Sequence, residues 1–245
     1  MANPSSKIAL ITGANKGIGF ETARQLAQQS MRVLIGARDE ARGGAAVEKL
    51  RKDGLDARAI TIDVTNPASI AAAAEEVERA HGRLDVLVNN AGLLKTGQDG
   101  LPSQTSATAL RETFDTNFFG LVAVTQAFLP LLRKSPAGRI VNVSSILGSH
   151  AEHADSNSGI YTAKTFAYDA SKAAVNLFTG HLAYELRETK IKVNSGHPGW
   201  VKTDMGGANA PLEIPDGAKT IVWLATLPDA GPTGGFYHQQ VHLRW

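Results

Sequence analysis

The sequence predicts one α/β domain built on a doubly wound parallel sheet. Apolar, β-rich runs alternate with helical patterns along the chain, which is the pattern of successive right-handed βαβ units. These runs are almost continuously apolar, as strands buried on both faces are. The 245 residues suit one such domain or two small ones, and no repeat, low-complexity tract or linker divides residues 1–245. We therefore expect a single domain.

The expected elements follow in chain order. The strands are Ile8–Thr12, Arg32–Gly36, Ala59–Asp63, Val86–Asn89, Arg139–Ser144 and Ile191–Ser195. The helical patterns between them span Ile18–Gln29, Glu40–Asp53, Pro67–His81, Thr108–Arg133 and Tyr161–Thr189.

Two segments interrupt this alternation. Residues 149–158 are polar and poor in helix formers, which indicates an exposed loop. Residues 204–215 contain glycine, proline and asparagine and indicate a mobile connection. Segments of this kind often form the walls or the lid of a site in an α/β protein.

Composition and charge exclude several classes of function. The net charge of +2 is small and the basic residues form no run, so we expect no nucleic-acid partner. The chain has no cysteine, which excludes disulfides, thiol catalysis and cysteine-ligated metal. No apolar stretch appears long enough to span a membrane, and the polar segment Met1–Lys7 does not resemble a secretory signal. We expect a cytoplasmic protein without a membrane partner.

A glycine-rich turn, Thr12–Gly19, joins the first strand to the first helix. Gly13 can make the tight turn, while Gly17 and Gly19 allow the backbone to approach a pyrophosphate and the helix to pack on the strand. The helix N-terminus supplies free N–H groups and the positive end of a dipole. The spacing is Gly-x-x-x-Gly-x-Gly, and its place between the first strand and a helix predicts nucleotide binding.

The end of the second strand predicts which dinucleotide binds. An acid there would bond the 2′-hydroxyl of NAD, whereas an arginine would receive the 2′-phosphate of NADP. Ala37 stands where the acid would be, Arg38 follows it, and Lys16 adds a second cation, so we expect NADP(H). Asp39 is the counter-argument, because a small shift would put it on the ribose; its alternative role is to cap the next helix.

Tyr168 and Lys172 stand four positions apart, which places both on one face of a helix. A nearby cation favours phenolate over phenol, so we expect Lys172 to lower the pKa of Tyr168. A tyrosine with a lowered pKa can exchange a proton with a carbonyl or alcohol oxygen near neutral pH.

Together these motifs resemble the short-chain dehydrogenase/reductase family over nearly the whole chain. Besides the glycine-rich turn and the Tyr168/Lys172 pair, the family's order is matched by Asn89–Gly92, Asn117, Ser144–Ser145 and Pro198–Gly199. The stretch 36–44 and the ending through Trp245 are most similar to its carbonyl reductases. The resemblance implies a Rossmann-type sheet of about seven strands, the last near Gly235–His238, and the use of NADPH.

The resemblance also implies roles for individual residues. The catalytic set is Asn117, Ser145, Tyr168 and Lys172, with Tyr168 as proton donor, Ser145 bonded to the substrate oxygen, and Asn117 holding a water that links Lys172 to solvent. The cofactor-binding set is Gly13, Asn15, Lys16, Gly17, Ile18, Gly19, Arg38, Asp63, Val64, Asn90, Ala91, Gly92, Tyr168, Lys172, Pro198, Gly199, Val201 and Thr203.

Alternatives remain at three of these positions. Ser144 is a rival to Ser145, although successive strand residues face opposite ways and only one can enter the site. Asp63 matches an adenine contact or a helix cap. Thr203 matches a contact to the nicotinamide carboxamide, or else a helix cap.

One departure from the family's pattern concerns Ser145 and Tyr168, which stand 23 positions apart. The extra length makes 149–158 an insertion before the catalytic helix, and it leaves the oligomeric state, a homodimer or homotetramer by the family's habit, open. Tyr161 and Lys164 imitate the catalytic pair at the wrong spacing. His150 and His153 lack a clear third ligand, so we expect no metal site, and packing explains His197.

The predicted function is NADPH-dependent reduction of an aldehyde, ketone or quinone, a small-molecule carbonyl substrate. The alternatives are an NAD-dependent secondary-alcohol dehydrogenase and a non-catalytic NADP(H)-binding sensor or scaffold. Residues 93–97, 149–158 and 204–215 are expected to line the substrate pocket, whose apolar members suggest a modest apolar carbonyl compound.

Overall fold

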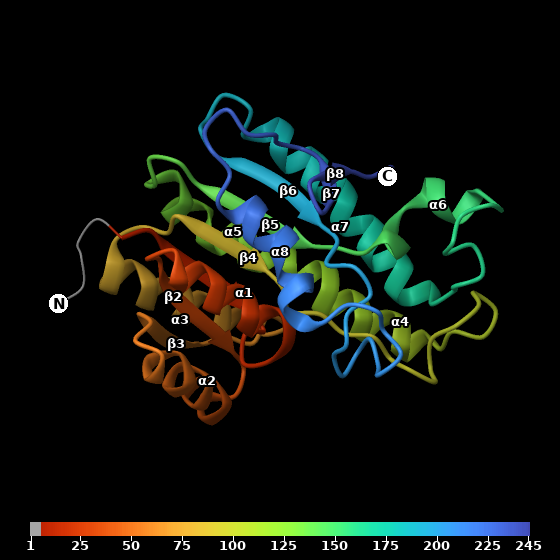
Figure 1. Cartoon of the computed structure of the whole chain (residues 1–245), viewed down its shortest axis with the longest axis horizontal. Coiled ribbons are helices and arrows are strands. Elements are labelled where there is room, and N and C mark those ends of the chain that lie inside the picture. Colours follow the sequence, from red (N-terminus) through yellow and green to blue (C-terminus); the bar gives the residue numbers. More distant parts are fainter. Residues whose placement is uncertain (1–5) are drawn as a thin grey trace.

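The computed structural model describes residues 6–245, so the first five residues of the segment that we expected not to be a secretory signal lie outside it. The sheet of the described chain has eight strands in the order β3-β2-β1-β4-β5-β6-β7-β8 (Figure 1). The strands are β1 (Ile8–Thr12), β2 (Arg32–Ala37), β3 (Ala57–Thr61), β4 (Val86–Asn89), β5 (Arg139–Val143), β6 (Lys192–Gly196), β7 (Phe236–His238) and β8 (Val241–His242). All pairings are parallel except that of β7 with β8. The predicted doubly wound sheet is confirmed.

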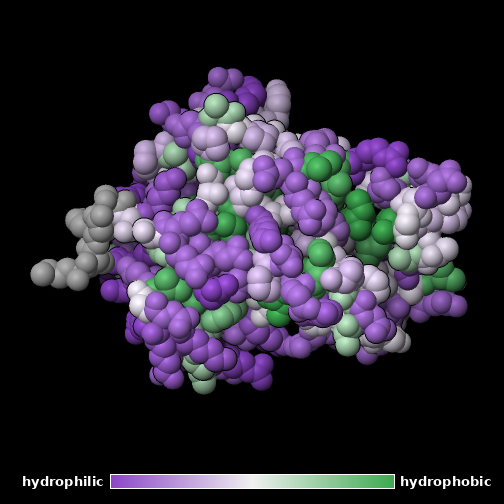
Figure 2. All heavy atoms as spheres, in the orientation of Figure 1, coloured by the Kyte–Doolittle hydropathy of each residue, from purple (hydrophilic) through white to green (hydrophobic). Residues whose placement is uncertain are grey.

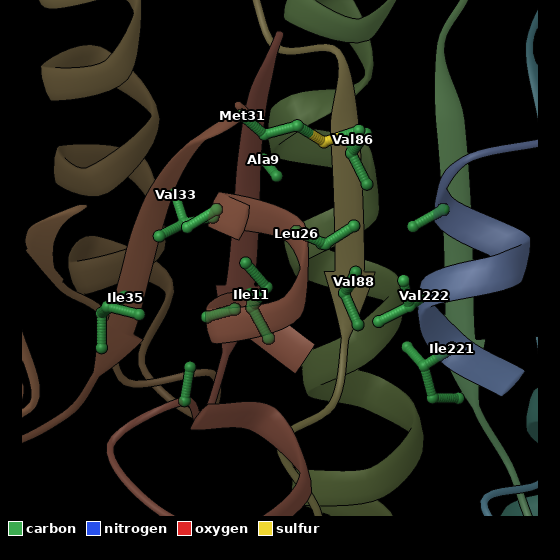
Figure 3. Packing of buried hydrophobic residues seen from close by; sticks show 14 of the residues in the cluster. Ala9, Ile11, Leu26, Met31, Val33, Ile35, Val86, Val88, Ile221 and Val222 are labelled. Atoms are coloured by element: carbon green, nitrogen blue, oxygen red, sulfur yellow. The ribbon is translucent and has the colours of Figure 1, made fainter. Parts of the chain in front are cut away.

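Helices cover both faces of this sheet. The α-helices of residues 6–245 are α1 (Gly17–Gln28), α2 (Glu40–Lys52), α3 (Pro67–His81), α4 (Ala107–Phe114), α5 (Gly120–Arg133), α6 (His150–Ala154), α7 (Phe166–Glu185) and α8 (Ile214–Ala225). One core cluster joins the sheet to α1, α2 and α8, and Figure 3 shows Leu26 of α1 and Val222 of α8 beside Val88. The other cluster joins the sheet to α3, α5 and α7. Alternate residues of β1 therefore belong to different cores, which explains why the strand is apolar throughout.

Three expectations about elements are corrected by the structure. The third strand begins and ends two residues earlier than predicted, at Ala57–Thr61. An eighth strand, Val241–His242, turns back on β7. Helix α8 was missed, because its first turn contains Pro215 and Gly217 and looks like a loop. Proline in the first turn is in fact a helix-start signal, and Gly217 is needed because a Cβ there would lie 2.6 Å from Val201.

The long helical pattern 108–133 is interrupted. A π-helical turn, Asp115–Phe119, separates α4 from α5. By length and composition alone, Ala107–Arg133 is apolar enough to cross a membrane, so our expectation that no stretch reaches that length is wrong. Part of its hydrophobicity serves the core, because Phe128 and Leu132 are fully buried against the sheet, while Phe119 is exposed.

The segment before α7 is more ordered than an open loop. Residues 150–154 form α6, and α7 begins at Phe166, not at Tyr161 as predicted. The chain's last residues lie against α6: Ala151 N donates to Trp245 O, and Arg244 pairs with Glu152 and Asp155. Residues 149–158 and the C-terminal residues therefore form one unit at one end of the sheet (Figure 1).

The arrangement of strands fixes where a ligand can bind. The chain order reverses between β1 and β4, which are neighbours in the sheet, and such a reversal leaves a crevice at the carboxyl ends of the strands. The surface seen in Figure 2 is mainly polar, with apolar residues in small separate groups. The sequence motifs that follow the strands therefore lie together at the carboxyl ends of the strands, where this crevice is.

Candidate active site

The glycine-rich turn is held against the end of β4. Gly13 and Gly17 have positive φ angles of 64° and 61°, which a side chain disfavours. The Asn90 amide donates to Thr12 O at 2.8 Å, and the N–H groups of Asn90 and Ala91 donate to Thr12 Oγ1. The two predicted motifs are thus one bonded unit.

This unit fits a dinucleotide. A Cβ on Gly13 would lie 3.0 Å from Ala91 Cα, and one on Gly19 would lie 2.4 Å from Asn90 Nδ2, so only glycine permits the close approach. Lys16 precedes α1 without a side-chain cap, and its ammonium is directed to Asp204 instead. The first N–H groups of α1 therefore remain available for an anion. Asn15 lies in this turn, and Ile18 packs on the core beneath it.

The end of β2 resolves the role of Asp39. Its carboxylate accepts from Arg42 N at 2.9 Å and caps α2, so the capping alternative is confirmed. Asp63 is not a helix cap: Asn66 caps α3, and Asp63 Oδ1 accepts from the N–H and hydroxyl of Thr65. These bonds, together with the charge of Arg38, lower the pKa of Asp63. The charge of Arg38 thus acts on Asp63, and the Val64 backbone packs against Gly120, where a Cβ would lie 2.5 Å from Val64 O.

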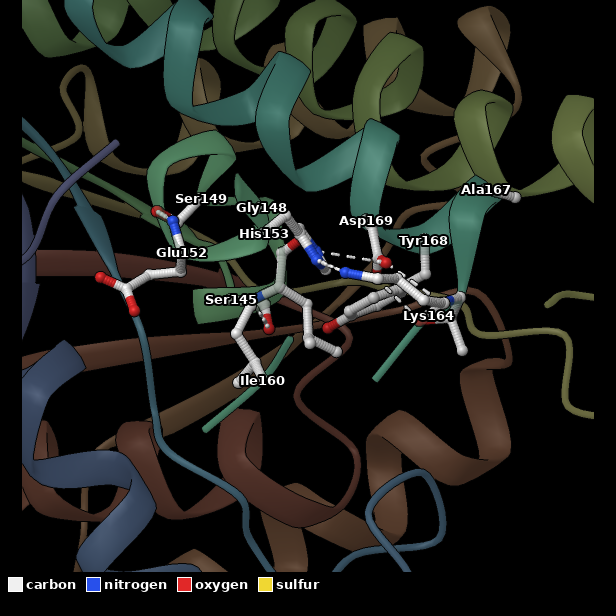
Figure 4. A network of polar contacts seen from close by, with 12 residues as sticks. Ser145, Gly148, Ser149, Glu152, His153, Ile160, Lys164, Ala167, Tyr168 and Asp169 are labelled. Atoms are coloured by element: carbon white, nitrogen blue, oxygen red, sulfur yellow. Dashed lines mark hydrogen bonds and ion pairs between the residues drawn. The ribbon is translucent and has the colours of Figure 1, made fainter. Parts of the chain in front are cut away.

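The two serines after β5 face different partners. Ser144 Oγ donates to Asn176 Oδ1 of α7 at 2.7 Å. Ser145 lies beside Tyr168, whose side chain extends toward it (Figure 4). The structure thus brings Ser145, and not Ser144, to the phenol.

Tyr168 and Lys172 occupy successive turns of α7, with Lys172 Nζ 5.6 Å from the centre of the phenol ring. The expected lowering of the tyrosine pKa is not found. Burial raises the pKa of Tyr168 to about 12, a hydrogen bond with Ser145 opposes this rise, and the charge of Asp169 adds to it. Burial also lowers the pKa of Lys172 to about 8, and its ammonium donates to Val143 O at 2.7 Å. Loss of water around each group is therefore the main cause of both shifts.

Asn117 lies in the π-helical turn and is fully buried. Its Oδ1 accepts from Leu93 N at 2.7 Å, and its Nδ2 donates to Leu93 O and Ser171 Oγ. A Cβ on Gly92 would lie within 3.8 Å of both Asn117 Oδ1 and Lys172 Nζ, so these three residues meet at the site. Single π-helical turns are frequent at functional sites.

The loop after β6, residues 197–206, lies against the glycine-rich turn. Pro198 is buried, and Gly199 has a φ of 88°. Val201 pairs with Leu212, and Thr203 Oγ1 accepts from Gly206 N, so Thr203 caps a turn and no helix. A Cβ on Gly17 would lie 3.8 Å from Thr203 Cγ2, which puts this loop against the glycine-rich turn.

A polar network ties the 149–158 segment to α7 (Figure 4). His153 contacts Lys164 through Nδ1 at 2.8 Å, and its Nε2 lies 3.3 Å from Asp169 Oδ2. Asp169 directly follows Tyr168, so this wall of the site is attached next to the phenol. His150 and His153 do not gather ligands: among residues 6–245, no group of three acidic, histidine or cysteine side chains is placed to hold a metal ion.

Two contacting residues escaped the sequence reasoning. Gly148 touches α7 so closely that a Cβ would lie 2.6 Å from the carbonyl carbon of Lys172. Asp99 accepts hydrogen bonds from the N-terminus of α7. Neither belongs to a local motif, and only the fold brings them to the site.

The chain is similar to known proteins over nearly its whole length. The family model of the short chain dehydrogenases matches residues 7–212. The chain is 37% identical to carbonyl reductase (NADPH) 1 of Mus musculus over 279 aligned residues, covering 98% of this chain and 99% of that protein. It is 34% identical to (+)-neomenthol dehydrogenase of Arabidopsis thaliana, with 98% of each chain covered.

Among solved structures, the NADPH-bound carbonyl reductase from chicken fatty liver superposes with a TM-score of 0.85 at 28% identity. The match covers 98% of this chain and 99% of that one. The alignment with the mouse protein is longer than the 245 residues of this chain, so the mouse protein has segments that this chain lacks.

Proposed function

The chain belongs to the short-chain dehydrogenase/reductase family, and from that premise we propose that it reduces aldehydes, ketones or quinones with NADPH. It is an NADP(H)-dependent oxidoreductase of the carbonyl reductase type. The observation that carries the proposal is the direction of the Tyr168 side chain, which extends toward Ser145 with Lys172 one turn further along α7.

The residues around the crevice would hold the cofactor in two places. The turn Gly13–Gly19 and the uncapped start of α1 would receive the pyrophosphate, and Arg38 with Lys16 the 2′-phosphate. Asn90–Gly92, Lys172 and the loop Pro198–Thr203 would hold the nicotinamide end. When bound, NADPH supplies the hydride.

The protein's own residues supply the proton and the polarisation. Because burial keeps Tyr168 neutral, the phenol retains its proton until negative charge develops on the substrate oxygen, and then donates it. Ser145 is a second fixed donor for that oxygen, and donors placed in advance stabilise developing charge. Such acid catalysis is typically worth about 10²–10⁴-fold. The Asn117 side chain is already bonded to Leu93 and Ser171, so we assign the water that resupplies the proton to its backbone carbonyl.

The test follows NADPH oxidation against a panel of aldehydes, ketones and quinones, with Tyr168→Phe and Tyr161→Phe side by side. Tyr161 is 43% exposed and lies outside α7, so its loss controls for removing a hydroxyl. We expect turnover to collapse only in Tyr168→Phe. Equal activity of both variants would remove Tyr168 from the mechanism.

The two rival functions make different predictions. An NAD-dependent alcohol dehydrogenase would prefer NAD⁺ with a secondary alcohol. The cations Lys16 and Arg38 argue against this function, because they favour the 2′-phosphate that only NADP(H) carries. A sensor would bind NADPH without turnover of any substrate, and it would have no physical need for the Ser145, Tyr168 and Lys172 arrangement. Comparing both cofactors in both directions separates the three.

The expected substrate wall would combine Leu93 and Leu94 with polar groups from the 149–158 and 204–215 segments, and this supports a modest apolar carbonyl compound. We also propose a cytoplasmic location, supported by the lack of cysteine and testable by imaging a fluorescent fusion.

We propose a homodimer formed through α4, α5 and α7. An apolar hollow on this face contains Leu110, Phe114, Phe119, Phe166 and Ala170, with Arg111 and Asp115 among them. A two-fold axis would let Arg111 of each subunit face Asp115 of the other, which makes the surface self-complementary. Light scattering of the wild type and Phe119→Glu tests this, since the variant should dissociate; a monomeric wild type would contradict it.

A further inference from the structure

We propose that Asp99 is a positioning residue for Tyr168, acting from a separate loop through the backbone of the catalytic helix. Asp99 Oδ1 accepts from Ala167 N at 2.9 Å, and Oδ2 accepts from Tyr168 N at 3.0 Å. The inference rests on the proposed role of Tyr168 as proton donor.

Helix α7 has no cap of its own. Thr165 precedes its first residue but makes no capping bond, because its hydroxyl donates to Asp169 at 2.7 Å. The remaining N–H of the first turn, that of Phe166, donates to Gly100 O. Residues 99 and 100 therefore receive the first three N–H groups of α7, and the third of these belongs to Tyr168.

The carboxylate of Asp99 is itself held in place. Thr105 Oγ1 donates to Oδ1 at 3.1 Å, and Asp99 N donates to Lys95 O. The same loop is fixed at its start, because Leu93 exchanges two hydrogen bonds with Asn117. The loop 93–106 thus runs from the π-helical turn to the start of α7 and passes the expected substrate wall.

Tyr168 is in the first turn of α7, where helices fray when their N–H groups lack partners. A carboxylate there also favours the helix because it faces the positive end of the dipole. Loss of the cap would let the phenol move relative to Ser145 and Lys172, and a displacement of about 1 Å can cost about 10²-fold in rate. Asp99 therefore fixes the phenol while making no contact with its ring.

Asn66 offers a matched control. It caps α3, which carries no predicted site residue, by accepting from Ala68 N at 3.0 Å and Ser69 N at 3.2 Å. Asp99→Ala and Asn66→Ala each remove two capping bonds, and each should destabilise the fold by a similar amount. A difference in kcat between the two variants then reflects the position of the Tyr168 phenol and not the stability of the fold.

The experiment measures kcat, KM, NADPH affinity and amide hydrogen exchange in the full-length wild type, Asp99→Ala, Asp99→Asn and Asn66→Ala. We expect kcat to fall about 10- to 100-fold in Asp99→Ala only, with NADPH affinity within about twofold. The amides of Ala167 and Tyr168 should exchange faster in that variant. Asp99→Asn keeps one acceptor oxygen, so its kcat should lie between those of the wild type and Asp99→Ala. If Asp99→Ala does not fold, Asp99→Asn takes its place in the comparison.

Equal kcat losses in Asp99→Ala and Asn66→Ala, or unchanged exchange at Tyr168, would overturn the inference. If the wild type turned over no carbonyl compound, the proposed function would fail separately. The exchange measurement would still decide whether Asp99 anchors Tyr168.

Discussion

Lys16 in the glycine-rich turn forms an ion pair with Asp204, which lies 188 positions later in the segment after β6. Lys16 is one of the two cations expected to receive the 2′-phosphate. The hydrogen bond from Lys16 lowers the pKa of Asp204, so the carboxylate is charged at neutral pH. Both side chains are well exposed, at 66% and 81%. Asp204 therefore competes with the phosphate for Lys16.

We predict that Asp204→Asn tightens NADPH binding. Exposed ion pairs are weak, so the gain should be about twofold to fivefold and should shrink at high salt. Fluorescence titration with NADPH and NADH at low and high ionic strength measures it. Asp216→Asn, which frees the exposed Lys219 on α8, is the control and should leave affinity unchanged. Equal gains for NADH and NADPH would mean that the pair does not bear on the 2′-phosphate.

We predict that Lys172→Met removes a pH dependence of stability. Burial lowers the pKa of Lys172 from 10.5 to about 8, so between these values the unfolded chain binds a proton that the folded protein does not. Wild-type stability therefore rises with pH in this window, and the variant lacks that rise. The difference in unfolding free energy should change by about 2 kcal/mol between pH 8 and 10.

Urea unfolding at several pH values measures this difference. Lys219→Met, at an exposed lysine, should run parallel to the wild type. A Lys172→Met curve that also ran parallel would show that the buried ammonium does not titrate in this range. The same variant should lose catalytic activity whatever its stability.

We predict opposite effects for alanine at two glycines. Gly19→Ala drives a methyl group against the Asn90 amide and Gly13 O, so it should break the bond between the turn and β4 and abolish NADPH binding. Gly44→Ala, inside α2 with no atom within 4 Å of the new Cβ, should stabilise the fold by about 0.5–1 kcal/mol. Thermal unfolding with and without NADPH distinguishes them. NADPH binding by Gly19→Ala would refute the close approach.

We predict that Arg244→Ala alters the substrate site and spares the cofactor site. Arg244 bonds Glu152 at 2.9 Å and Asp155 at 3.3 Å, and it thereby ties the C-terminal residues to α6. Its loss should raise KM for the carbonyl substrate and speed proteolysis within 149–165, at constant NADPH affinity. Arg187→Ala, an exposed arginine near the end of α7, is the comparison. A KM unchanged from the wild type would separate α6 from the substrate wall.

The sequence was sufficient where a feature depends on neighbouring residues. Six strands of the sheet, the glycine-rich turn and the α2 cap at Asp39 follow from local patterns, and all lie where predicted within a few residues. Local reasoning failed where distant groups decide. Helix α7 begins at Phe166 because residues 99 and 100 receive its first N–H groups, and no pattern around Tyr161 reveals this.

The prediction that Lys172 lowers the pKa of Tyr168 was wrong for the same reason. The spacing to Lys172 is visible in the sequence, but the loss of water that outweighs it comes from the whole fold. The ion pair of Lys16 with Asp204 could not be predicted from the sequence either, because the two residues are 188 positions apart. The sequence was therefore enough to propose candidate site residues that the fold brings together, such as Ser145 and Tyr168, while the pKa shifts of these residues depend on the whole fold.

The π-helical turn Asp115–Phe119 holds one residue more than an α-helical turn, which shifts everything after it by about 100° around the helix axis. Helix α4 can thus pack on α7 while α5, its direct continuation, packs on β4. Deleting one residue from this turn would leave the other side chains unchanged, but it would rotate α5 relative to α4. Either α4 would then turn away from α7 or α5 would turn away from β4. At exposed positions of this turn, such as Phe119, a substitution should therefore be tolerated better than a change in length.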